Sequence, residues 1–307
     1  MDRKKKKYYK ALVSFGVGII ILTCAVFANY ENAGGYSVCK EALKKVAYSE
    51  DFSADYTLNA KIDNEDFSGI YGSYKLKVDG NPSKATETTK LYKGEVADFM
   101  KFTRQDNNSV YEYYNDGEPW VHLMDDHYTV SSLADGLSPE SGDKVIFFAE
   151  TICDTMIGDL KNNFVLTAEE NGIRTYNASL SKEQMPSYVT AGVSLLTSLV
   201  RLDYAGVLED EEAEVDPIML FFGSDETYVQ DITMNMSVDK EGNPVQITGI
   251  ANVVGKDTDG KEHILSVDLS TDFYDFGSTK IKYYTEEDIK AYGSFTFVDG
   301  KKVMLEE

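Results

Sequence analysis

The sequence contains few of the residues that enzymes use for nucleophilic or metal-assisted catalysis. It has only three histidines and three cysteines in 307 residues. It also has no Gly-x-Ser-x-Gly motif, in which many hydrolases place their nucleophile, and no glycine-rich loop that could hold a phosphate. Carboxylates are so numerous that no single pair identifies a catalytic site. We therefore predict that the protein is not an enzyme and has no cofactor.

Two short segments resemble metal sites, but other features argue against both. His122 and His127 flank two aspartates at a spacing that fits a turn between strands better than one helical face. Asp257 and Asp259 resemble the start of a calcium loop, yet Lys261 follows and no glutamate occupies the twelfth position. We expect a solvated turn at the first segment, an ordinary hairpin at the second, and no metal at either.

Basic residues are scarce as well, and most of the chain is strongly acidic. There are 30 Lys and Arg against 52 Asp and Glu, which gives a formal net charge of −22. Residues 1–10 hold six basic residues and one acidic residue, so the remainder carries about −27. Such a charge repels phosphate backbones, which excludes nucleic acid as a partner, whereas cationic ligands would be attracted. Solubility alone is a sufficient reason for the charge.

One uncharged apolar run, residues 11–28, follows the basic cluster Arg3–Lys7. This order predicts export, with the basic end retained in the cytoplasm. Three interpretations remain open: a retained transmembrane helix, a signal peptide cleaved before Asn29, or a lipoprotein signal with Cys24 acylated. The run is long enough to span a bilayer. Thr23 stands where lipoprotein signals usually have a smaller residue, so we favour the membrane anchor, with the main domain outside the cell membrane.

Cys39 and Cys153 remain outside the membrane under this interpretation. A pair of cysteines in an oxidising compartment can form a disulfide. Both residues also lie in apolar patterns of helical spacing, where a buried free thiol is common. The sequence leaves a disulfide and two buried thiols as alternatives.

The first part of the exported chain predicts one helix followed by strands. Residues 36–48 have apolar side chains at helical spacing with lysines on the other side. From residue 55 the period changes to two, which indicates strands with one wet face. Turn-forming sequences at 80–82 and 115–117 separate such runs and predict antiparallel hairpins. The predicted strands include 55–62, 74–78, 110–114 and 120–123.

The second part mixes helices and strands. One helix is expected from about residue 143 to 160, and a longer one, down to residue 202, should begin at a capping box formed by Ser181 and Gln184 with Pro186 in its first turns. The acidic run 209–214 is expected to be a solvated loop. Alternating runs predict strands at 164–168 and 173–180, joined as a hairpin at Glu170-Asn171-Gly172, and further strands at 228–238, 245–254 and 263–273. A terminal strand pair is expected at 294–298 and 301–305.

Tyrosine is abundant, with 21 residues against a single tryptophan. Tyr111, Tyr113, Tyr114 and Trp120 lie together in one predicted hairpin, where they could bind sugars or peptides by stacking. Half-buried antiparallel strands favour tyrosine for packing reasons alone, so both interpretations remain.

The order of these elements resembles the LolA lipoprotein-carrier superfamily and its LppX, LprG and LolB-like relatives. The resemblance rests on the exported start, the early helix, the Tyr113–Gly117 turn followed by Trp120, and the segment Asp272–Gly277 that closes the last long strand. It implies a highly curved antiparallel sheet wrapped around helices as an unclosed barrel over residues 36–284. It also implies an apolar cavity for acyl chains.

We accordingly predict an α+β protein with a LolA-like half-barrel. Its parts are a cytoplasmic basic segment (1–10), a transmembrane helix or signal segment (11–28), a linker (29–35), an extracytoplasmic β-rich domain (36–284) and a C-terminal strand pair or appendage (285–307). The expected function is the binding of lipid or lipoprotein acyl chains at the cell envelope. The alternative is a sensor or protein-interaction domain of the same fold without cargo.

Overall fold

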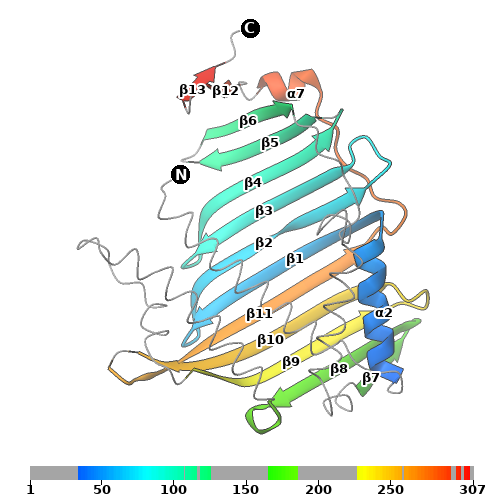
Figure 1. Cartoon of the computed structure of the whole chain (residues 1–307), viewed down its shortest axis with the longest axis vertical. Helices are drawn as coiled ribbons and strands as arrows, with labels where there is room; N and C mark the ends of the chain where they lie inside the picture. The colour runs from blue at the N-terminus through cyan, green and yellow to red at the C-terminus, as the bar shows by residue number, and fades with distance from the viewer. Residues whose placement is uncertain are drawn as a thin grey trace.

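The computed structural model describes residues 34–106, 108–115, 118–125, 165–185, 227–257, 259–291, 295–298 and 301–304. Two helices, α2 (Gly34–Tyr48) and α7 (Glu286–Ala291), accompany one large and one small sheet (Figure 1). The strands of the large sheet are β1 (Asp51–Ile62), β2 (Glu65–Lys77), β3 (Lys84–Tyr92), β4 (Glu95–Gln105), β5 (Asn108–Asn115), β6 (Glu118–Asp125), β7 (Val165–Glu170), β8 (Ile173–Ser181), β9 (Tyr228–Val238), β10 (Pro244–Lys256) and β11 (Glu262–Tyr274). The small sheet pairs β12 (Phe295–Val298) with β13 (Lys301–Met304).

The large sheet is an open antiparallel sheet made of two meanders joined in the middle. Its strand order is β6-β5-β4-β3-β2-β1-β11-β10-β9-β8-β7. Each strand therefore pairs with its neighbour in sequence except at the centre, where β1 pairs with β11 from Ser53↔Tyr274 to Ile62↔Leu265. Figure 1 shows this junction as a blue strand beside an orange one. The prediction of antiparallel hairpins is confirmed.

Several hairpins have two-residue turns in the left-handed region. Both central residues have positive φ in the turns Asp63-Asn64, Lys93-Gly94 and Asn171-Gly172. This is the type I′ geometry, whose twist matches that of the flanking strands. The predicted hairpin at Asn171-Gly172 is confirmed. Lys93 has a positive φ, which is uncommon for lysine and is not expected from the sequence.

The two faces of the sheet differ in chemistry because successive side chains alternate between them. One face, here called the apolar face, has a row of directly opposed residues across five strands: Ala60, Val267, Ala251, Ile232 and Leu180. The other, here called the polar face, has a row three residues farther along each strand: Thr57, Ser270, Thr248, Asn235 and Asn177. This alternation confirms the predicted pattern of strands with one wet side.

Helix α2 packs on the apolar face. Tyr36, Cys39 and Ala42 recur every three residues along one side of the helix and are fully buried. The helix contacts β9 and β10 and runs across the strands rather than along them (Figure 1). At its last turn the Lys45 ammonium donates a hydrogen bond to the carbonyl of Glu241, which ties the helix to the β9–β10 turn. The predicted helix over 36–48 is confirmed.

The predicted capping box of Ser181 and Gln184 is present, but the prediction that it begins a long helix is wrong. The Ser181 amide donates to Gln184 Oε1 at 3.0 Å, but the pair encloses a single 3₁₀ turn, Lys182–Gln184. Met185 then has extended backbone angles, φ −70° and ψ 119°, so no helix runs through it. The cause is Pro186, because a proline disfavours the helical conformation of the residue before it.

The expected helices at 143–160 and 186–202, the acidic run 209–214 and segment 11–28 lie outside the described residues. Within the described ranges, neither α2 nor α7 combines the length and the apolarity that crossing a membrane requires.

The C-terminal chain returns across the sheet after β11. The Thr279 amide donates to Asp51 Oδ1 at 2.9 Å. Farther along, Gln105 forms two hydrogen bonds with the backbone of Tyr284, accepting from its N–H at 2.8 Å and donating to its C=O at 2.7 Å. The Tyr284 hydroxyl donates to Glu112 at 3.2 Å, and its ring packs on Val110. Residues 275–284 thus form a strap that connects β1 with β4 and β5.

Candidate functional site

The apolar face is the larger of two candidate sites. Seventeen buried residues from α2, β2 and β8–β11 form its main cluster. A smaller cluster contains Phe52, Ala54 and Leu76 at the ends of β1 and β2, together with Val46 of α2. Phe273 packs against both clusters, so the apolar surface is continuous from β8 to β2.

Part of this face is only half-buried. Leu58, Ala60 and Ile62 of β1 pack at the margin of the main cluster and retain intermediate exposure, as does Phe273 of β11. Apolar carbon at this margin is available for further burial, at about 25 cal/mol for each Å² removed from water. The chemistry of this face suits an aliphatic ligand.

The predicted aromatic residues fall on the β5–β6 hairpin, at the edge of the sheet. The register places Tyr113 opposite Trp120, while Tyr114 is opposite Pro119. Stacking of a sugar or peptide on Tyr111, Tyr113, Tyr114 and Trp120 stays a prediction.

Of the three cysteines, only Cys39 lies in the part of the chain that the structure describes. Cys39 is buried in α2, and burial raises the pKa of its thiol to about 12. Cys24 and Cys153 lie outside the described residues, so lipidation and the disulfide stay predictions.

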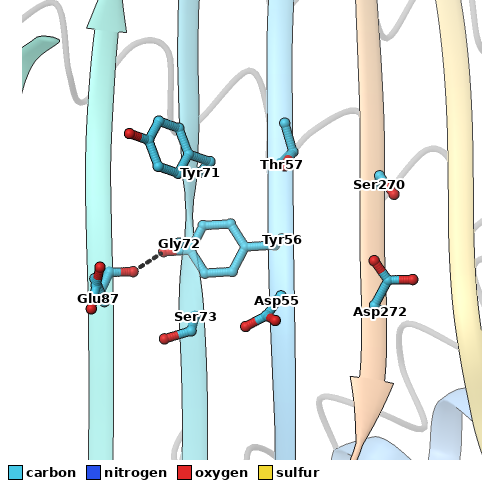
Figure 2. Close-up of a pocket in the computed structure, with 9 residues that line it drawn as sticks. All are labelled: Asp55, Tyr56, Thr57, Tyr71, Gly72, Ser73, Glu87, Ser270 and Asp272. Carbon is cyan, nitrogen blue, oxygen red and sulfur yellow. Dashed lines mark hydrogen bonds between the residues drawn. The ribbon is translucent and has the colours of Figure 1, made fainter.

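The second candidate site is a shallow depression of about 410 Å³ on the sheet, where β1, β2, β3 and β11 meet. Figure 2 shows its lining: Asp55, Tyr56, Thr57, Tyr71, Gly72, Ser73, Glu87, Ser270 and Asp272. All except Tyr56 and Gly72 belong to the polar face by register. The lining is therefore made of carboxylates, hydroxyls and one exposed tyrosine ring.

Gly72 determines the shape of the strands below this depression. An ideal Cβ built on Gly72 would lie 1.8 Å from the carbonyl oxygen of Glu87 and 2.9 Å from the Tyr56 hydroxyl. Tyr56 is directly opposite Gly72 and extends past it toward β3, where its hydroxyl donates to the Glu87 carbonyl oxygen at 3.3 Å (Figure 2). The same hydroxyl lies 2.8 Å from Thr88 Oγ1. An aromatic ring thus covers a cross-strand glycine.

Two aspartates from opposite ends of the chain meet in the depression. Asp55 of β1 is directly opposite Asp272 of β11. Tyr274 donates to Asp55 Oδ1 at 3.0 Å, and Gln246 Nε2 donates to Asp272 Oδ1 at 2.7 Å. Burial, followed by the bond to Asp55, raises the pKa of Tyr274 to about 12, so its hydroxyl remains a donor at neutral pH. Within the described ranges, no ion pair involves either aspartate.

His263 forms a separate charged cluster at the opposite end of the strands. Its Nδ1 lies 2.7 Å from Asp63 and its Nε2 lies 3.1 Å from Asp257. The bond to Asp257, and then the bond to Asp63, raise the pKa of His263 and favour the doubly protonated ring. The contacts of His263 with Asp63 and Asp257 join the β1–β2 turn to the β10–β11 turn.

Asp257 also organises its own turn. Its carboxylate accepts the amides of Asp259 and Lys261, both at 2.9 Å, which is the ordinary hairpin that the sequence predicts. Among the described residues, no group of three or more His, Cys, Asp and Glu is arranged to hold a metal ion. His127 lies outside these residues.

Sequence reasoning missed the Asp55–Asp272 pair. The two residues are more than 200 positions apart, and each falls in an alternating strand where an aspartate on the wet face is unremarkable. Only the register of β1 on β11 brings them together.

No protein-family model and no curated protein matches the chain. Among solved structures, the chain is similar to a LolA-superfamily protein from Nitrosomonas europaea, with 7% sequence identity over 80% of this chain and 94% of that chain. The TM-score is 0.19. The resemblance is weak and concerns the fold alone, as an open antiparallel sheet with few helices. Function therefore has to be inferred from the residues of this chain.

Proposed function

We propose that the protein is tethered to the cell membrane and binds lipid or lipoprotein acyl chains on the apolar face of its sheet. The observation that carries this proposal is the continuous apolar surface from β8 to β2, together with its half-buried margin at Leu58, Ala60 and Ile62. Each CH₂ group that an acyl chain buries contributes about 0.8 kcal/mol, so burial of about ten CH₂ groups supplies the free energy of micromolar binding, about 8 kcal/mol.

The proposed tether is segment 11–28, with its basic flank in the cytoplasm. A domain held by a helix does not diffuse as a free carrier does. It would act at the outer surface of its own membrane, receiving or presenting a lipid there. Protection of residues 1–10 but not of residues 34–304 from protease added to intact cells tests this topology.

Lipid binding is tested on the full chain released from membranes. Native mass spectrometry should detect a co-purified acyl lipid, and the purified chain should take up a fluorescent fatty acid. Leu58→Gln places an amide on the apolar face and should weaken uptake at least about tenfold. Thr57→Gln is the matched control, since the neighbouring residue belongs to the polar face, and it should leave uptake unchanged.

Absence of co-purified lipid and of fatty-acid uptake would refute the proposal. Equal effects of the two substitutions would refute the assignment of the apolar face. Either result would favour an extracytoplasmic interaction domain that uses the same sheet without cargo.

A further inference from the structure

The depression over β1, β2, β3 and β11 is a second binding site, on the opposite face of the sheet from the proposed acyl site. We propose that it binds a sugar ring that carries a free amino group, as in a glucosamine-containing glycan. The proposal does not depend on lipid binding, because the side chains that carry it, Tyr71, Asp55 and Asp272, all belong to the polar face.

Tyr71 provides the stacking surface. Tyr71 is 43% exposed although it lies in the middle of β2. In Figure 2 it lies along one side of the depression, and the register places it opposite Thr57 of β1. A flat sugar face packs on an exposed aromatic ring at little conformational cost, since tyrosine has only two side-chain torsions.

Asp55 and Asp272 provide the charge. Like charges directly opposite each other on neighbouring strands destabilise a sheet. Both donors that approach them, Tyr274 and Gln246, are neutral, and no Lys or Arg of the described chain forms an ion pair with either carboxylate. A ligand ammonium placed between the two aspartates would relieve this repulsion through charge-assisted hydrogen bonds.

Hydroxyls complete the lining and fit the same class of ligand. Thr57, Ser73 and Ser270 surround the carboxylates and can donate to or accept from sugar hydroxyls (Figure 2). The volume of about 410 Å³ is within the usual range of small-molecule sites, roughly 300–1,000 Å³. An aliphatic ligand could not form hydrogen bonds with these hydroxyls and carboxylates. Phosphorylated or uronic sugars are anionic, so the aspartates and the net charge of −22 on the chain would repel them.

The test is isothermal titration of the full chain in lipid nanodiscs with tetra-glucosamine. The N-acetylated tetramer and tetralysine serve as comparison ligands. Tetra-glucosamine should bind in a saturable manner at least about tenfold more tightly than either, because one lacks the ammonium and the other lacks the ring. Equal binding of the acetylated tetramer would overturn the role of the carboxylates, and equal binding of tetralysine would overturn the role of the sugar ring.

Variants locate the site. Tyr71→Ala and Asp272→Asn should each weaken the affinity about tenfold or more. Tyr92→Ala is the control for the first, since Tyr92 is 41% exposed but lies outside the depression. Asp268→Asn is the control for the second, because Asp268 is on the same face of β11 and bonds Asn59 instead.

A purely structural role is distinguished by stability. Asp272→Asn removes one of two opposed charges, so the unliganded variant should unfold at a higher denaturant concentration than the parent chain while binding more weakly. Absence of saturable tetra-glucosamine binding, or equal losses in test and control variants, would overturn the proposal.

Discussion

Replacement of Gly72 by alanine is expected to destabilise the sheet strongly. The added Cβ would lie 1.8 Å from the Glu87 carbonyl oxygen, whereas real Cβ contacts essentially never fall below 3.0 Å. Strands β2 and β3 would have to separate by more than 1 Å, and the Tyr56 hydroxyl, 2.9 Å from the same Cβ, would have to move as well.

The size of the effect follows from three contributions. Overpacking costs about 1–3 kcal/mol, and loss of the hydrogen bond between Tyr56 and Thr88 costs about 1 kcal/mol. The lower unfolded-state entropy of alanine offsets about 0.4–1 kcal/mol. We therefore expect Gly72→Ala to reduce the free energy of unfolding by about 1–4 kcal/mol.

Gly249→Ala is the matched control. Gly249 also lies in mid-strand without a positive φ, and its Cβ would meet Met234 Cγ at 3.5 Å, which is an ordinary contact. This variant should be neutral or more stable by up to about 1 kcal/mol. Urea unfolding followed by circular dichroism measures both, and equal midpoints for the two glycine variants would refute the steric argument.

Three further predictions concern other parts of the molecule. Because the pKa of His263 is raised, its stabilising contribution is complete below the ordinary histidine pKa of about 6.5 and is lost as the pH rises through the raised value. The difference in urea midpoint between the parent chain and His263→Gln should therefore be larger at pH 6 than at pH 9. A constant gap would contradict this. In a chain whose other two cysteines are replaced by serine, Cys39 should react with a thiol reagent at pH 8 only after unfolding, and rapid native-state labelling would show that the thiol is not buried. Gln105→Ala should cost about 1–3 kcal/mol and increase amide exchange around Tyr284, whereas the exposed Gln246→Ala should do neither.

Local chemistry made many strands and some turns predictable, whereas β3, β4 and the turn Lys93-Gly94 between them were not predicted. Alternation between apolar and polar residues identified the strand at Tyr228–Val238, and the Asn171-Gly172 pair identified the β7–β8 hairpin, because both signals act within a few residues. The capping-box error has the same local character: Ser181 and Gln184 do form their bond, but Pro186 prevents the helix from starting there.

Which strands pair with each other was harder to predict than where the strands lie in the sequence. Nothing in the sequence of β1 states that its second neighbour is β11 rather than another strand with the same alternation. The polar depression depends entirely on that pairing, since Asp55 comes from one strand and Asp272 from the other. The strap bond between Gln105 and Tyr284 is equally non-local, so its two residues look ordinary in isolation.

The central β1–β11 pairing also constrains how the chain can fold. β1 pairs with β2 as soon as both have been synthesised, but its other edge has no partner until residues 262–274 have followed. During that interval the half-sheet β1–β6 exposes the hydrogen-bonding groups of a long strand, a surface prone to pairing with other chains. We expect folding to be limited by this late closure, as is usual for contacts of large sequence separation. With the export proposed above, the chain would depend on extracytoplasmic chaperones until β11 has paired with β1.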